Sequence, residues 1–233
     1  MNWTYWLIDA GTIAIPFLFS FHPRIRFFEH FTNYLAAAVP VGIVFIIWDA
    51  WFTHLGVWGF NSRYLLGPSI LGLPMEECLF FLCIPFSCQF TIHVLRRYRP
   101  VQWKKTTLQR VTILLSALLL ALALFSFGKM YTTITCAALG IALPLACWLG
   151  AAKSLGDLLA YYPVLLIPFF IVNGILTGTG LDEPVVWYNN TENLSIRIGT
   201  IPVEDVVYGF LLLLLNLVGY DMLLPRKINT PSV

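Results

Sequence analysis

The chain has 233 residues, of which 58% are hydrophobic and 11% are charged, and its mean hydropathy is +0.77. Soluble domains carry about 25% charged residues, so this composition excludes a soluble globular protein and a disordered chain. The net charge of +2 is small and the basic residues fall between apolar segments, so nucleic acid is not an implied partner. The sequence therefore predicts an all-α polytopic protein, a multi-pass protein of the cell membrane in contact with the lipid bilayer.

Apolar segments long enough to cross a bilayer follow one another along the chain. A helix needs about 20 apolar residues to span the hydrocarbon layer. We expect about seven transmembrane helices by this measure, at residues 3–21, 32–53, 74–95, 107–127, 131–151, 158–178 and 201–224. The first segment lacks preceding basic residues and carries Trp3, Tyr5 and Trp6, so we expect it to be a retained helix and not a cleaved signal peptide.

The placement of lysine and arginine predicts the orientation of these helices. With the N-terminus outside, the inner segments hold 11 of the 14 basic residues, and the outer segments hold only Arg63, Lys129 and Arg197. The inner residues are Arg24, Arg26, Arg96, Arg97, Arg99, Lys104, Lys105, Arg110, Lys153, Arg226 and Lys227. Because basic residues concentrate in cytoplasmic loops, we expect the N-terminus outside and the C-terminus inside.

The second half of the chain repeats the first half at a shift of 128 residues, without a gap. The shift aligns Pro16 with Pro144, Pro40 with Pro168, and Pro74-Met75-Glu76-Glu77 with Pro202-Val203-Glu204-Asp205. Prolines recur in many membrane helices, but this does not explain the matched acidic pairs. We predict two three-helix repeats, residues 1–105 and 129–233, joined by a linker helix over 106–128 in one integrated membrane domain. A single linking helix makes the repeats parallel.

Each acidic pair follows a proline at the outer start of a helix. Proline suits the first helical turn, and acidic side chains interact favourably with the positive helix N-terminus. The pairs could therefore be helix-end residues that face lipid headgroups. Ionisable residues in or beside membrane spans are costly and indicate function, and two matched pairs among 12 acidic residues favour a functional site.

Adjacent residues of a helix do not face each other, so the carboxyls of one pair cannot readily share a proton. Close pairing must come from opposite repeats, for example Glu76 against Glu204. Two carboxyls in a low-dielectric gap cannot both stay ionised, and one of them would then be a neutral acid beside an anion. The helix faces do not decide which acid of each pair faces the site. Glu76 and Glu204 are the first choice because both repeats carry the same residue there.

Aromatic and amide side chains near the acidic pairs are the candidates for substrate binding. Aromatic rings can line an apolar channel and stabilise a cation through their faces. Tryptophan and tyrosine also collect at any membrane interface, so both interpretations stay open. The candidates are Trp58, Phe60, Asn61, Phe80, Trp187, Tyr188, Asn189 and Tyr208.

Three segments of the chain resemble the integral-membrane lycopene cyclase family. They are Trp58-Gly59-Phe60-Asn61, the segment Leu-Pro-Met-Glu-Glu-Cys-Leu-Phe-Phe over 73–81, and Ile201-Pro202-Val203-Glu204-Asp205. In that family a three-helix domain with a Pro-x-Glu-Glu/Asp motif occurs twice, as two subunits or fused in one chain, and the likeness covers nearly all of this sequence. The second motif departs mildly, because it ends in aspartate and is followed by fewer aromatic residues.

The resemblance implies an isomerase (intramolecular lyase) of carotenoid biosynthesis, which converts the ψ-ends of lycopene into β-rings, giving γ-carotene or β-carotene. It implies that Glu76, Glu77, Glu204 and Asp205 are catalytic, that an acid starts the reaction, and that no flavin or other cofactor takes part. The sequence has no Gly-x-Gly-x-x-Gly motif opening a βαβ unit, and no metal-ligand spacing.

Two other functions fit the same residues. A carotenoid hydratase would form the same cation but capture it with water, and a proton-coupled transporter could use the buried acids. A retinal-binding pump needs a lysine in its last helix, and the segment 201–224 contains none. The sequence carries no aspartate-rich motif for diphosphate binding, which disfavours a prenyltransferase.

Overall fold

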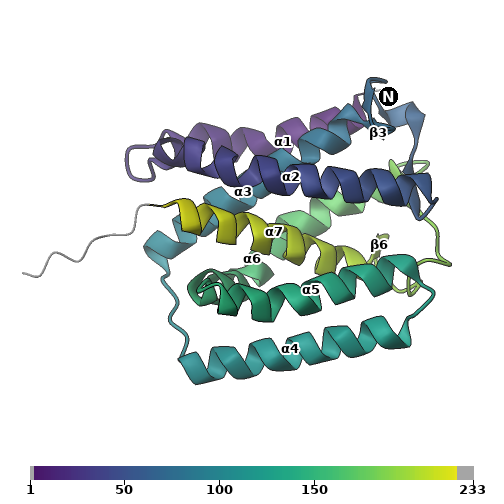
Figure 1. Cartoon of the computed structure of the whole chain (residues 1–233). Coiled ribbons are helices and arrows are strands. Elements are labelled where there is room, and N and C mark those ends of the chain that lie inside the picture. The colour runs from purple at the N-terminus through teal and green to yellow at the C-terminus, as the bar shows by residue number, and fades with distance from the viewer. Residues whose placement is uncertain (1–2, 225–233) are drawn as a thin grey trace, which may run out of the picture.

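A computed structural model describes residues 3–224 of the chain, which form a bundle of seven α-helices (Figure 1). The helices are α1 (Thr4–Ser20), α2 (Phe31–His54), α3 (Met75–Tyr98), α4 (Lys105–Phe125), α5 (Met130–Trp148), α6 (Ala152–Leu176) and α7 (Val203–Leu223). Six of them, α2 to α7, are long and apolar enough to cross a membrane, and α1 is a shorter apolar helix of 17 residues. The all-α polytopic fold is therefore confirmed.

Each predicted segment overlaps one helix, and the largest difference between predicted and observed bounds is at the start of α6. This helix begins at Ala152 and not near residue 158. Its first turns carry Lys153 and Asp157, which hydropathy alone places outside a span, but Asp157 is buried in ion pairs at this end. Arg226 and Lys227, used for the predicted orientation, and the outer ends of the predicted repeats lie outside the described residues.

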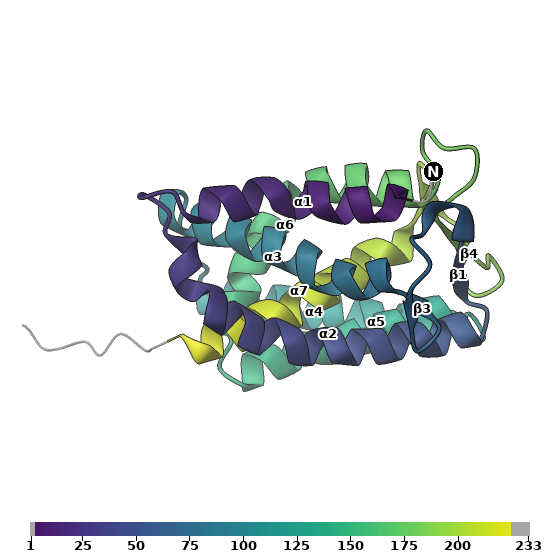
Figure 2. The same cartoon turned by 90° about the horizontal axis from the view of Figure 1, so that it is seen from above.

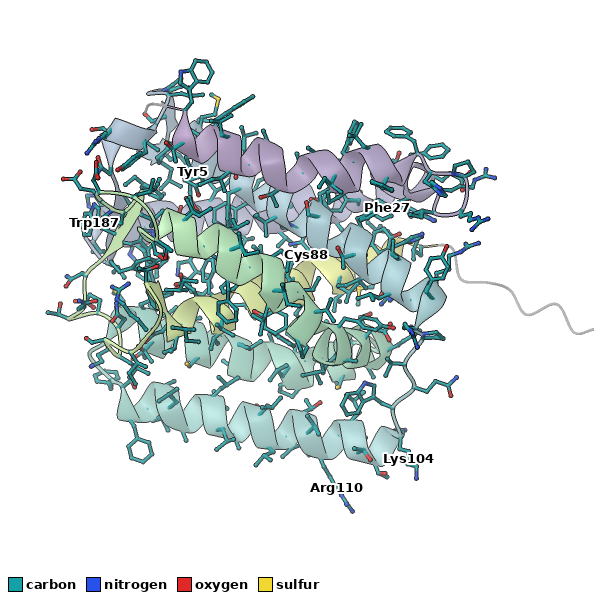
Figure 3. All side chains as sticks on the ribbon, turned by 180° about the vertical axis from the view of Figure 1, so that it is seen from behind. Tyr5, Phe27, Cys88, Lys104, Arg110 and Trp187 are labelled. Atoms are coloured by element: carbon teal, nitrogen blue, oxygen red, sulfur yellow. The ribbon has the colours of Figure 1, made fainter. Side chains whose placement is uncertain are left out.

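Short strands and turns connect the helices at the end where α1, α3, α5 and α7 begin (Figure 2). The strands are β1 (Trp58–Phe60), β2 (Ser69–Ile70), β3 (Leu73–Pro74), β4 (Val186–Tyr188), β5 (Arg197–Ile198) and β6 (Ile201–Pro202). The 3₁₀ turn η2 (Ser62–Tyr64) lies at the same end, whereas the 3₁₀ turn η1 (Phe27–His30) lies between α1 and α2 at the opposite end of the bundle. Lys104 lies at the end opposite Trp187 (Figure 3), as the predicted orientation requires, although the orientation itself stays a prediction.

The hydrogen bonds before α3 and α7 repeat at the same 128-residue shift as the sequence. Strand β2 pairs Ser69 with Pro74, and β5 pairs Arg197 with Pro202, both antiparallel. The Met75 amide donates to the Pro68 carbonyl at 3.0 Å, and the Val203 amide donates to the Ile196 carbonyl at 3.1 Å. The two acidic helices therefore begin from loops with the same hydrogen-bond pattern.

Strands β1 and β4 join the two repeats around a local two-fold axis. Gly59 pairs with Trp187, which is its own equivalent in the second repeat, while Trp58 pairs with Tyr188 and Phe60 pairs with Val186. A Cβ at Gly59 would lie 2.4 Å from the Trp187 ring, so the absence of a side chain lets the indole cover this strand. The pairing holds the starts of α3 and α7 at one end of the bundle.

Equivalent prolines in α1 and α5 leave equivalent carbonyls free. A proline lacks the N–H that would bond to the carbonyl four residues earlier, which is Thr12 for Pro16 and Gly140 for Pro144. Ser87 of α3 donates to the Thr12 carbonyl at 3.0 Å, and Ser116 of α4 donates to the Gly140 carbonyl at 2.5 Å. Helix α4, which packs along the outside of α5 (Figure 1), thus supplies in the second repeat what α3 supplies in the first.

An ion-pair network fastens α3, α6 and α7 at the opposite end of the bundle. The Arg96 guanidinium donates two hydrogen bonds of 2.6 Å to Asp221 and one of 2.8 Å to Asp157. Ser154 donates to Asp221 at 2.6 Å, and Lys153 donates to Asp157 at 2.5 Å. The carboxyl of Asp157 is buried, whereas the side chain of Lys153 is 75% exposed.

We expect Arg96→Met to lower the free energy of unfolding by about 3 kcal/mol, because removal of one partner of a buried ion pair leaves an uncompensated charge. The matched control is Lys153→Met, which touches the same Asp157 from an exposed position and should cost less than about 1 kcal/mol. Reversible unfolding in mixed detergent micelles measures both values. Equal losses in the two variants would contradict the role of Arg96.

Candidate functional site

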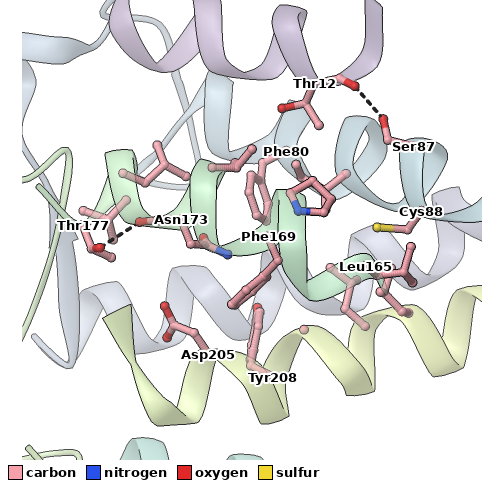
Figure 4. Close-up of a pocket in the computed structure, with 18 of the residues that line it drawn as sticks. Thr12, Phe80, Ser87, Cys88, Leu165, Phe169, Asn173, Thr177, Asp205 and Tyr208 are labelled. Atoms are coloured by element: carbon pink, nitrogen blue, oxygen red, sulfur yellow. Dashed lines mark hydrogen bonds between the residues drawn. The ribbon is translucent and has the colours of Figure 1, made fainter. Parts of the chain in front are cut away.

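A largely apolar cavity of about 360 Å³ lies between α1, α3, α6 and α7 (Figure 4). On α3 its wall extends from Glu77 to Thr91, which is about 21 Å along the helix at 1.5 Å per residue. One end of the cavity reaches the start of the acidic helices, and Asp205 and Tyr208 of α7 project into it. The cavity therefore connects apolar helix faces to buried carboxyls.

Glu77 is the acidic residue of the first repeat on the cavity wall. It lies in the first turn of α3, directly after the proline that ends β3, and it is buried. The hydroxyl of Tyr5, a fully buried side chain of α1, donates to Glu77 Oε2 at 2.5 Å. This bond fixes one carboxyl oxygen toward α1.

Asp205 is the equivalent residue of the second repeat, and both of its oxygens accept hydrogen bonds from tyrosines. Tyr131 of α5 donates to Oδ1 at 2.6 Å, and Tyr188 of β4 donates to Oδ2 at 3.0 Å. Burial, and then the charge of Asp205, raises the pKa of the Tyr188 phenol well above its ordinary value, so this hydroxyl remains a hydrogen-bond donor. Asp205 is thus held in a more polar environment than Glu77.

A third carboxyl, Asp49 of α2, also lines the cavity and is 3% exposed. Its side chain lies near Glu77 and near the Trp58 indole. The equivalent position in the second repeat is Thr177, which lines the cavity as well. The two halves of the site therefore differ in charge although the repeats match in backbone.

Glu76 and Glu204 do not line the cavity but bind the loops that precede their helices. The Leu66 amide donates to Glu76 Oε1 at 2.6 Å, and the Leu194 amide donates to Glu204 Oε1 at 2.8 Å. The Thr132 hydroxyl donates to the same Glu204 oxygen at 2.6 Å. The sequence-based preference for Glu76 and Glu204 as the facing pair is therefore corrected. Adjacent side chains of a helix point in different directions. The first acid of each motif therefore points toward the loop, and the second acid points toward the cavity.

Five of the eight predicted substrate-binding residues line the cavity, namely Trp58, Phe60, Phe80, Tyr188 and Tyr208. The rings of Trp58, Tyr188 and Tyr208 lie close to one another. The centroids of Trp58 and Tyr208 are 6.1 Å apart, as are those of Trp58 and Tyr188. These five side chains form an aromatic wall of the cavity that holds the carboxyls.

The other three predicted residues have structural contacts away from the cavity. Trp187 is 44% exposed and lies over Gly59. The Asn61 and Asn189 side chains each accept a hydrogen bond from the amide two residues later, both at 3.1 Å. They stabilise equivalent turns, which explains why the two asparagines match at the 128-residue shift.

Tyr5 and Tyr131 are not among the site residues that the sequence predicts. At the 128-residue shift Tyr5 aligns with Thr133 and Tyr131 aligns with Trp3, so the repeat does not mark either tyrosine. Their one visible signal is their place in the first turns of α1 and α5, at the end of the bundle that holds the acidic motifs. Chemically, the assembled site offers two differently bonded carboxyls, a third carboxyl nearby and the faces of several aromatic rings.

A family model described as lycopene cyclase matches the chain over residues 2–95 and 128–223. The first matched region contains α1, α2 and most of α3, and the second contains α5, α6 and α7. The internal repeat is thereby confirmed, while the exact bounds of the repeats and of the linker stay predictions. No curated protein and no solved structure matches the chain.

We expect Glu76→Ala to lower the free energy of unfolding by about 1–3 kcal/mol, because the Leu66 amide then loses its acceptor. Glu76→Gln retains the Oε1 acceptor and should cost less than about 1 kcal/mol. Unfolding of both variants in mixed micelles measures the difference. If alanine and glutamine were equally destabilising, the hydrogen bond to the loop would not be the role of Glu76.

Proposed function

Because this chain belongs to the lycopene cyclase family, we propose that it is a β-cyclase that converts the ψ-ends of lycopene into β-rings without a cofactor. Membership gives the chain the general role of a lycopene cyclase and hence of an enzyme. The β-specificity, the isomerase (intramolecular lyase) chemistry and the location in the cell membrane are parts of the proposal. The observation that carries it is the apolar cavity that ends at Glu77 and Asp205.

An apolar cavity in a membrane bundle suits a hydrocarbon that dissolves only in the bilayer. Cyclisation needs an acid to protonate an alkene, a base to remove a proton, and an environment that stabilises a carbocation. Two carboxyls supply the acid and the base, and the faces of the aromatic wall stabilise positive charge. The apolar lining also keeps water away from the cation, which water would otherwise convert into an alcohol.

The reaction begins when a protonated carboxyl donates its proton to C2 of the terminal C1=C2 bond, which leaves a tertiary cation at C1. The electrons of the C5=C6 bond then form the C1–C6 bond, so a six-membered ring closes and the cation moves to C5. A carboxylate removes the proton from C6, and the electrons of that C–H bond restore C5=C6 in the β-ring. One proton enters and one leaves, so the step involves no net redox change.

The hydrogen bonds support different roles for the two cavity carboxyls. Both oxygens of Asp205 accept phenol hydrogens, which stabilises its carboxylate form. Glu77 accepts the Tyr5 hydrogen at Oε2. We assign Glu77 as the proton donor and Asp205 as the base. Before the next turnover Asp205 loses this proton and Glu77 gains a new one by exchange with water, while Glu76 and Glu204 position the loops.

We expect Glu77→Gln and Asp205→Asn to lower ring formation by about 100-fold or more, the range for loss of a general acid or base. The matched controls are Glu76→Gln and Glu204→Gln, which keep their loop hydrogen bonds and should retain most of the activity. The measurement is the pigment profile of lycopene-accumulating cells that express each variant at equal membrane levels. Full β-carotene output from both cavity variants would refute the assignment of the acids.

We also expect each new ring to carry one deuterium at C2 when membranes react with lycopene in D₂O, because a carboxyl proton exchanges with water before it reaches the alkene. Mass spectrometry of the extracted pigments measures this label, with unreacted lycopene as the internal control. Rings without deuterium would argue against protonation by an exchangeable acid. A hydroxylated polar product would instead indicate a hydratase.

A further inference from the structure

The cavity opens sideways near the middle of the bundle. Gly11 and Ile15 of α1 and Pro168 of α6 line the cavity and are also exposed on the outer surface, Ile15 at 66%. All three lie well inside their helices, far from the connecting loops. In a membrane such a surface faces the hydrocarbon layer, so the opening leads into lipid and not into water.

Small and helix-bending residues keep this opening wide. A Cβ at Gly11 would meet nothing within 4 Å. Pro16 of α1 and Pro168 of α6 line the cavity, and prolines bend helices where they remove a backbone hydrogen bond. Below the opening, Phe169 of α6 points toward Tyr208 of α7 beside Asp205 (Figure 4). A continuous apolar path therefore runs from the lipid to the carboxyls.

The equivalent space in the other half of the molecule is filled. Asn173 and Leu176 line the cavity, and their equivalents at the 128-residue shift are Phe45 and Trp48. The ring centroids of Phe45 and Trp48 lie 5.1 Å and 5.4 Å from that of Tyr208. These two large rings thus occupy the volume that their smaller equivalents leave open.

The equivalent of the lateral opening is closed as well. The counterpart of the exposed Ile15 is Leu143, which is 1% exposed in the core. Helix α4 also covers α5, where Ser116 bonds to the Gly140 carbonyl. The duplicated fold therefore presents one lateral entrance among its described residues, although it carries two acidic motifs.

We infer that the substrate enters from the lipid between α1 and α6 and that the enzyme binds one ψ-end at a time. This inference rests on the proposed function. A cavity of about 360 Å³ is at the low end of the range of roughly 300–1,000 Å³ that holds drug-sized molecules, and a full carotenoid is larger. The rest of the polyene stays in the bilayer, so the substrate class is any carotenoid with one acyclic ψ-end, whether its other end is open or already a ring.

The first test is a time course in membranes with lycopene in large molar excess over the enzyme. A substrate that must leave and re-enter for its second ring gives monocyclic γ-carotene first and bicyclic β-carotene after a lag. γ-Carotene supplied alone should be converted at a comparable rate for each acyclic end. A constant share of β-carotene from the earliest time, or no conversion of γ-carotene, would overturn the inference.

The second test narrows the entrance with Ile15→Trp, a change at an exposed position that leaves the core intact. We expect the rate of cyclisation to fall by about tenfold or more. The matched control is Leu18→Trp on the same helix, which is 69% exposed, does not line the cavity and should stay within about twofold of wild type. Membrane levels and thermal unfolding of both variants confirm equal folding.

The outcomes separate the entrance from the reaction itself. An active wild type with an unaffected Ile15→Trp variant would overturn lateral entry between α1 and α6 while the cyclase function stands. A wild type that leaves lycopene unchanged, despite confirmed insertion in the membrane, would overturn the proposed function and this inference with it.

Discussion

The buried carboxyls at the starts of α3 and α7 set the main physical constraint on this molecule. An ionisable group away from water is stable only when hydrogen bonds or opposite charges compensate for its lost hydration. Here phenol hydroxyls from α1, α5 and β4 supply these bonds to Glu77 and Asp205. One oxygen of the first acid of each motif accepts a hydrogen bond from the amide of its own preceding loop. The helices that carry the tyrosines must therefore meet the acidic helices at one end of the bundle.

The pairing of β1 with β4 makes this meeting possible. Two equivalent strands that pair around a local two-fold axis bring the two acidic helix starts to the same place. At the opposite end, Arg96 links α3 to α6 and α7 through Asp157 and Asp221. The bundle is thus fixed at both ends, and the apolar cavity occupies the region between them. This arrangement leaves room for an apolar ligand without loss of the helix packing around it.

Duplication explains the parts of the site that match between the repeats, and sequence divergence between the repeats explains why the cavity is asymmetric. The loops, turns and first acids are equivalent in both repeats, because they build the same backbone twice. The repeats differ in the tyrosines around the second acid of each motif. They also differ at three equivalent positions, where the first repeat has Asp49, Phe45 and Trp48 and the second has Thr177, Asn173 and Leu176. A symmetric scaffold thereby carries an asymmetric cavity, which suits the different roles proposed for Glu77 and Asp205.

The seven helices, the repeat and the two acidic motifs are predictable from the amino-acid order, because hydropathy, proline spacing and motif order are properties of the chain alone. The tertiary structure was needed to show that Glu77 and Asp205, and not Glu76 and Glu204, line the cavity. It also decided that Tyr5 and Tyr131 hold these acids, and that Asn61 and Asn189 stabilise turns. The reason is that helix geometry makes the two acids of a motif point in different directions but does not determine which of them faces the interior of the bundle. That direction depends on helices far apart in the sequence, and their contacts at Tyr5 and Tyr131 do not repeat at the 128-residue shift.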